Sequence, residues 1–188
     1  MSAVVSDAGP LIHLAQLNKL FLLREIFKNV TVTSGVKREV VDVGIDLGYD
    51  DAIVVRLAVE EGWVSVRDDP GEVASAVERL ARCENISVSD AETLLFARES
   101  KAEAILVDER VLSELARMYG FTVWSTCTIL LEALGRGLIE FSDVESAIVE
   151  LADRRHKLKD GQAAEILGAA RLVVSKRKGK AKRVGEKR

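Results

Sequence analysis

The chain has 188 residues, of which 48% are hydrophobic and 30% charged, a composition typical of a soluble globular protein that can bury its own core. Its apolar runs are far shorter than the ~20 residues that span a bilayer, and Asp7 and Pro10 interrupt the order that a secretory signal needs, so we expect a cytoplasmic protein. Cys83 and Cys127 lack CxxC spacing and the chain has only two histidines, so neither a zinc site nor a disulfide framework is indicated.

Short apolar runs with β propensity alternate along the chain with segments of helical spacing. The first run precedes a helical pattern that starts at Ala8, and the run that ends at Val107 precedes a helix with Leu112 and Leu115 on its apolar stripe. Because strands that alternate with helices form parallel crossovers, we predict an α/β fold with three layers, α/β/α, and a central parallel sheet. The predicted strands are Val4–Ser6, Val30–Val32, Trp63–Val66, Ala104–Val107 and Phe121–Trp124.

The charge is distributed unevenly. The last eighteen residues hold nine of the 27 basic and one of the 30 acidic residues, which gives this tail a charge of +8 and the preceding 170 residues −11. We predict one domain over residues 1–170, with two final helices between Asp143 and Ala170, and a disordered tail over 171–188. The tail is either a solubilising terminus or a nucleic-acid contact, and the candidate contacts are Lys176, Arg177, Lys178, Lys180, Lys182 and Arg183.

Two acidic residues come directly after predicted strands. Asp7 comes after Val4–Ser6, and Asp108 comes after Ala104–Val107. Since ligands of open parallel sheets collect beyond the carboxyl ends of the strands, both carboxylates are expected at the same edge of the sheet. The alternative for each is a structural role as the N-cap of the next helix.

A third acid lies within an apolar helical stripe. In a helix that begins near Ser34, Val36, Glu39, Val40 and Val43 fall at positions i, i+3, i+4 and i+7. A buried carboxylate is unfavourable without a cation, so we expect Glu39 to meet one. The cation is either a metal ion or an arginine in a structural salt bridge.

A fourth acid stands beside a helix start. Ser89 and Glu92 fit a capping box, with Ser89 as the N-cap and Glu92 reaching back to it. Asp90 is not needed for that box and shares its helix face with Leu94 and Ala97, so we expect it to point inward. Its alternative role is stabilisation of the helix dipole.

Four carboxylates that converge would raise one another's pKa unless a cation neutralised them. Their oxygen-only donors suit Mg²⁺ or Mn²⁺, which can activate water for attack on a phosphodiester. Nothing in the sequence indicates a Walker loop, a dinucleotide-binding loop or a serine–histidine–aspartate order.

The residues that carry this pattern resemble the PIN-domain nucleases, and more closely the prokaryotic single-domain branch of toxin-like ribonucleases. The resemblance covers about Val4 to Ala170 and implies a parallel sheet, phosphodiester hydrolysis with Mg²⁺ or Mn²⁺, frequent homodimers, and Asp7, Glu39, Asp90 and Asp108 as catalytic and metal-binding acids. The matching segments are VVSDAGPLIHLA, VTSGVKREVV, SVSDAETLLFARE and AILVDERVLSELARMYGFTVWST.

The sequence departs from that branch in three places. Ala8 and Gly9 stand where hydroxyl residues are frequent, which removes a polar contact near the metal or the phosphate. The acidic pair Asp108-Glu109 leaves open which carboxylate faces the metal. Thr126 is either a further ligand or a helix cap.

We therefore predict a metal-dependent endoribonuclease that acts on single-stranded RNA. One alternative is a nucleic-acid-binding module with weak or no catalysis, in which the tail or residues such as Lys37 and Arg38 hold the phosphates. Another is the toxin of a toxin–antitoxin pair, whose antitoxin-like protein partner would block the acidic edge with an arginine.

Overall fold

The computed structural model describes residues 3–67, 74–153 and 161–185, with side chains as far as Arg177. The contacts divide the chain into two compact units, Met1–Thr126 and Cys127–Arg188. The predicted domain boundary between residues 170 and 171 stays a prediction, and a single helix runs through that position.

The first unit contains a five-stranded sheet in which every strand pair is parallel, which confirms the predicted fold class. The order is β3-β2-β1-β4-β5, so β1 is the central strand and is paired on both sides. All three residues of β1 and of β4 are buried, as expected for strands covered on both faces. The strands are β1 (Val4–Ser6), β2 (Val30–Thr33), β3 (Val64–Arg67), β4 (Ala104–Leu106) and β5 (Thr122–Trp124).

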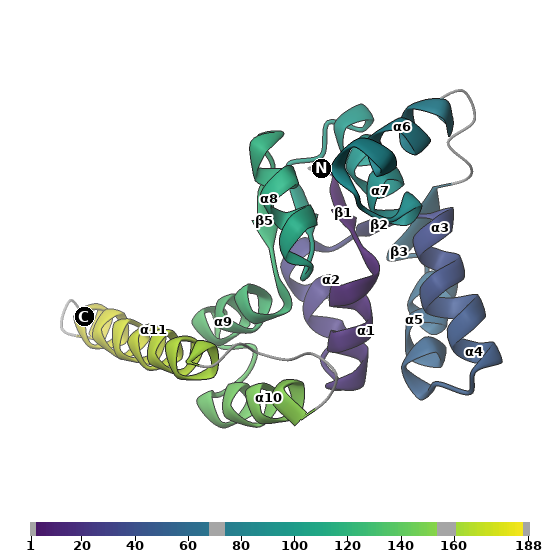
Figure 1. The fold of residues 1–188 in the computed structure, drawn as a ribbon. Coiled ribbons are helices and arrows are strands. Elements are labelled where there is room, and N and C mark those ends of the chain that lie inside the picture. Colours follow the sequence, from purple (N-terminus) through teal and green to yellow (C-terminus); the bar gives the residue numbers. More distant parts are fainter. Residues whose placement is uncertain (1–2, 68–73, 154–160, 186–188) are drawn as a thin grey trace. The chain divides into compact units, whose positions relative to one another are not determined.

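The helices of this unit link the strands in two opposite directions. From β1 the chain proceeds through β2 to β3, and it then returns to the other side of β1 for β4 and β5. Right-handed connections therefore place α1, α2 and α5 on one face of the sheet and α7 and α8 on the other (Figure 1). The helices are α1 (Ala8–Gln16), α2 (Phe21–Phe27), α3 (Ser34–Lys37), the π-helical η1 (Arg38–Val43), α4 (Gly44–Asp46), α5 (Asp50–Glu60), α6 (Ala74–Glu84), α7 (Val88–Glu99) and α8 (Arg110–Met118).

A hydrophobic core lies between the sheet and the α7–α8 layer. Val5 and Ile105 from the two central strands pack with Leu94 of α7 and with Leu112 and Ala116 of α8. Each of these side chains is at most 1% exposed, and burial of a large aliphatic side chain contributes roughly 1.5–3 kcal/mol to folding. This core holds the carboxyl ends of β1 and β4 in a fixed register.

The second unit is helical and contains α9 (Thr126–Arg136) from Cys127 on, α10 (Phe141–Asp153) and α11 (Gln162–Gly185). Its basic end differs from the prediction of a disordered tail, because the backbone stays helical to Gly185. Lysine, arginine and alanine favour helices and no proline interrupts them, so the tail's low apolar content did not prevent helix formation. Among the described helices, none is long and apolar enough to cross a membrane.

Candidate functional site

The site begins where the order of the strands reverses. The strands β1 and β4 are neighbours in the sheet. Asp7 comes directly after β1, and Asp108 lies just beyond the end of β4. The Asp7 amide donates to the Leu106 carbonyl oxygen at 2.9 Å. This position is the topological switch point of the sheet, where α/β proteins bind their ligands.

Asp7 is a buried carboxylic acid, only 7% exposed. It occupies the N-cap position of α1, but its side chain makes no capping hydrogen bond, so a simple cap does not explain it. Burial raises the pKa of Asp7 to about 7; the Ala8 and Gly9 amides oppose this rise, and the negative charges of Asp90 and Glu39 add to it. Three of the four predicted acids therefore share one electrostatic site.

Glu39 lies in a single π-helical turn, η1, rather than in the regular α-helix that the sequence predicted. The wider turn changes which residues face the core: Val40 and Val41 are buried, whereas Glu39 and Val43 are exposed. The expectation that Glu39 shares the buried stripe is therefore wrong. Its carboxyl group is still partly desolvated, and this desolvation together with the charge of Asp90 raises its pKa.

Asp90 closes the capping box of α7, a role that the sequence analysis gave to Glu92. The N-cap of α7 is Ser87 rather than Ser89, and the capping box is closed by Asp90, whose Oδ2 accepts from the Ser87 amide at 3.2 Å. The predicted box of Ser89 with Glu92 is wrong because the same Ser-x-x-acid spacing occurs two residues earlier, where the helix starts. The carboxylate of Asp90 nevertheless acts on both Asp7 and Glu39.

Asp108 belongs to a separate hydrogen-bond network. Its Oδ1 accepts from the Thr126 amide at 2.7 Å, and its Oδ2 accepts from the Thr126 hydroxyl at 2.6 Å and lies 2.7 Å from His13 Nδ1. Burial alone would raise the pKa of Asp108, but these hydrogen bonds outweigh it and hold the pKa below its ordinary value. An ionised carboxylate only accepts, so the hydrogen lies on His13 Nδ1.

His13 was missed by the sequence reasoning, because its partner lies 95 residues away along the chain. The only local signal is that Gly9 precedes it by one helical turn. A Cβ atom on Gly9 would lie 3.3 Å from the Asp108 Cβ, so the missing side chain lets β4 approach α1 closely. The hydroxyl donors expected at Ala8 and Gly9 are absent, and His13 and Thr126 supply donors to Asp108 instead.

The two residues of the acidic pair Asp108-Glu109 have different environments in the structure. Glu109 is exposed and is the N-cap of α8, where its Oε2 accepts from the Leu112 amide at 2.7 Å. Asp108 has a side chain that is only 5% exposed and faces the interior. Thr126 is fully buried and both of its donors are directed to Asp108. Asp108 therefore caps the start of α9, and the alternative of a structural role applies to it more than to Asp7.

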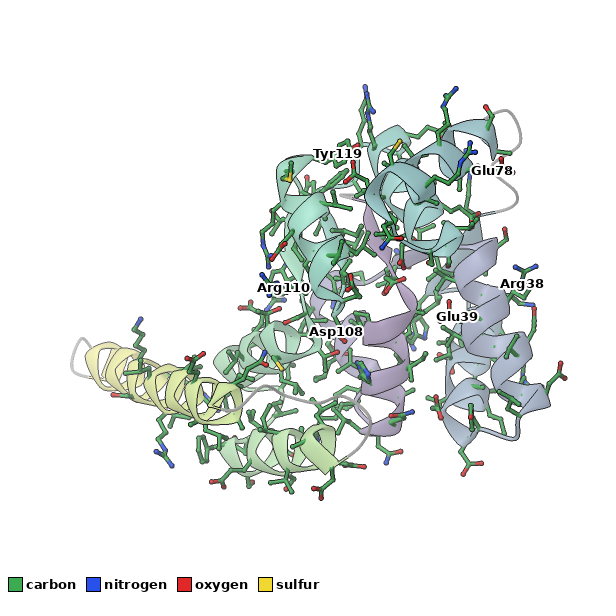
Figure 2. All side chains as sticks on the ribbon, viewed as in Figure 1. Arg38, Glu39, Glu78, Asp108, Arg110 and Tyr119 are labelled. Atoms are coloured by element: carbon green, nitrogen blue, oxygen red, sulfur yellow. The ribbon has the colours of Figure 1, made fainter. Side chains whose placement is uncertain are left out.

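The donor set fits a hard divalent cation, although the described residues do not bring three His, Cys, Asp or Glu side chains to metal-binding distance of one point. Asp7, Glu39 and Asp90 offer only carboxylate oxygens, the donors that Mg²⁺ and Mn²⁺ prefer. Burial is the main cause of the raised pKa of Asp7 and of Glu39, the charge of Asp90 adds to both, and a bound cation would relieve this repulsion. In Figure 2, Glu39 and Asp108 are labelled on either side of α1.

The predicted nucleic-acid contacts of the tail fall into two groups. Lys176 and Arg177 are exposed on α11, and Arg177 lies 3.5 Å from the Leu134 carbonyl oxygen and 3.6 Å from Glu140, so it also joins the helices of its own unit. The side chains of Lys178, Lys180, Lys182 and Arg183 lie outside the described residues.

Comparison with known proteins gives a family match over most of the chain. A family model described as a PIN domain matches residues 3–171. The chain is similar to a crystal structure of PAE2754 from Pyrobaculum aerophilum, with 18% sequence identity and a TM-score of 0.48 over 70% of this chain and 94% of that one. None of the curated proteins compared matches the chain.

Proposed function

The chain belongs to the PIN-domain family, whose members are generally nucleases, and we propose that it is an endoribonuclease that cuts single-stranded RNA with Mg²⁺ or Mn²⁺. The observation that carries the proposal is the buried Asp7, whose pKa is raised to about 7 by burial and by two neighbouring carboxylates. A carboxylic acid in this state has little structural value, and perturbed acids in such clusters are typical of functional sites.

Asp7, Glu39 and Asp90 would hold the metal ion. When bound, Mg²⁺ or Mn²⁺ lowers the pKa of a coordinated water and stabilises negative charge on phosphate oxygens. Asp108 has a supporting role: with its hydrogen bonds to His13 and Thr126 it ties the end of β4 to α1, and α1 begins directly after Asp7. These contacts would keep Asp7 in place, and Asp108 itself would not be a strong ligand of the metal ion.

A labelled single-stranded RNA tests the proposal. The purified protein with Mn²⁺ should cleave it internally, and Asp7→Asn should abolish both cleavage and Mn²⁺ binding measured by calorimetry. Asp46→Asn is the matched control, because Asp46 is an exposed aspartate on α4 outside the site. Intact RNA with the wild type, or equal cleavage by the wild type and Asp7→Asn, would remove the proposed activity.

A second candidate function is RNA binding with weak or no catalysis. It is favoured by the basic residues Lys176 and Arg177, which are exposed on α11. Lys176→Gln and Arg177→Gln should then weaken RNA binding and flatten its salt dependence. The wild type should show no cleavage at any Mn²⁺ concentration. Cleavage that disappears with Asp7→Asn would exclude this second function.

A further inference from the structure

A groove of about 360 Å³ lies within the first unit, on the helical segments η1 and α7 that also carry Glu39 and Asp90. It is formed by the start of α3, by η1 and by helices α6 and α7. This volume lies at the lower end of the range of small-ligand pockets. The lining residues are Ser34, Gly35, Arg38, Ala74, Val77, Glu78, Val88 and Glu92.

The groove contains an exposed cation. Arg38 makes no hydrogen bond or ion pair with any residue that the structure describes, whereas the neighbouring Lys37 is paired with Asp42 at 2.6 Å. The sequence offered both basic residues as means of holding phosphate. The structure leaves Arg38 available for this role, and its planar guanidinium group is suited to phosphate oxygens.

The rest of the lining combines an apolar wall with acceptors. Val88 is 59% exposed and offers a surface on which the flat face of a base can pack, and the lining also includes the buried Val77. Glu78 and Glu92 add carboxylate oxygens that can accept from base amino groups or ribose hydroxyls. This mixture of one cation, aliphatic surface and acceptors matches the chemistry of a nucleotide.

Close contact between α3 and α7 fixes the floor of the groove. A Cβ atom on Gly35 would lie 2.5 Å from the end of the Glu92 side chain, so α3 and α7 pack closely here. The hydroxyl of Ser89 lies beside the same glycine, is buried and has no hydrogen-bond partner among the described residues. The groove is therefore a built feature of the α3–α7 contact.

The groove and the acids share the same two helical segments. Arg38 directly precedes Glu39, and Glu92 is the second residue after Asp90. Figure 2 shows Arg38 and Glu39 extending from opposite sides of one helical turn. An RNA strand that crosses this turn can place one phosphate near the acids and the adjacent nucleotide in the groove.

We propose that this groove is a nucleotide subsite for the RNA substrate, in which Arg38 holds a phosphate next to the cleaved bond and Val88 supports the base. The inference rests on the proposed function for the identity of the ligand. In this inference Arg38 positions the substrate, and the carboxylates of Asp7, Glu39 and Asp90 bind the metal ion.

The experiment measures binding of a fluorescent single-stranded RNA in EDTA, where cleavage cannot occur, over a range of salt concentrations. Arg38→Ala should lower the affinity about fivefold and reduce the slope of log affinity against log salt by about 0.7, the value for one phosphate contact on a single strand. Lys37→Ala is the matched control because it removes an adjacent charge that is already paired, and its slope should stay close to the wild-type value. Val88→Asp should weaken binding at all salt concentrations.

Unchanged affinity and slope with Arg38→Ala, or equal losses with Lys37→Ala, would overturn the subsite. The result is separable from the proposed function. If the wild type binds RNA through Arg38 but never cleaves it, the nuclease activity is wrong and the subsite stands. If the wild type cleaves and Arg38→Ala changes neither KM nor the salt slope, the subsite is wrong and the nuclease activity stands.

Discussion

Replacement of Asp7 by asparagine should stabilise the metal-free protein at neutral and alkaline pH. Asparagine has nearly the shape of aspartate but cannot ionise. In the wild type the folded state holds Asp7 at a pKa of about 7, whereas in the unfolded chain its pKa has the ordinary value of 3.8. Burial is the largest cause of the difference, so the folded protein resists the charge that the unfolded chain accepts.

The sign and size of the effect are set by proton linkage. Below pH ~4 the acid is protonated in both states and contributes no difference. Between the two pKa values only the unfolded chain releases the proton, so the free energy of unfolding falls as pH rises, and the fall ends near pH 7. At about 1.4 kcal/mol per pKa unit, the full loss is roughly 4 kcal/mol, of which about 3 kcal/mol falls between pH 5 and pH 8.

Urea unfolding in EDTA at pH 5 and at pH 8 measures this difference. The free energy of unfolding of Asp7→Asn minus that of the wild type should grow by about 3 kcal/mol between the two pH values. Asp46→Asn, at an exposed position, should show no such growth. Parallel profiles for Asp7→Asn and the wild type, or a variant less stable than the wild type at pH 8, would refute the assignment of Asp7 as a destabilising buried acid.

Four other perturbations test the contacts around the acids. Asp108→Ala should lower the free energy of unfolding by about 3–5 kcal/mol in urea, because it leaves the buried donors of Thr126 without their charged acceptor; a loss below ~1 kcal/mol would contradict the network. Glu109→Ala removes only a helix cap and should cost about 1 kcal/mol, with unchanged Mn²⁺ affinity by calorimetry. Gly35→Ala displaces only the end of the flexible Glu92 side chain and should change the free energy of unfolding by less than about 1 kcal/mol, and a larger loss would show that this carboxylate is held in place. Mn²⁺ should raise the melting temperature of the wild type but not of Asp7→Asn, and an equal rise in both would place the metal elsewhere.

The sheet and the first acid were predictable from the sequence because both depend on local pattern. The apolar runs ending before Asp7 and Asp108 are buried parallel strands, and the carboxyl ends of parallel strands necessarily share one edge. The position of these two acids at one sheet edge does not depend on contacts between residues far apart in the chain.

The support around the acids could not be predicted in the same way. The contact of His13 with Asp108 depends on two elements brought together only by the fold. The start of α7 was ambiguous because Ser87 and Ser89 are each succeeded three residues later by an acid. The π-helical turn at Glu39 was hidden because the valines around it also fit α-helical spacing.

The π-helical turn also makes the site sensitive to chain length. A π-helical turn holds one more residue than an α-helical turn, so removal of one residue between Arg38 and Val43 would return the turn to regular spacing while α3 and α4 keep their buried faces. The helix itself would survive such a deletion, and so would most of its buried surface. The direction of Glu39 towards Asp7 and Asp90 would be lost. A one-codon change would thus remove the proposed site and leave a stable fold.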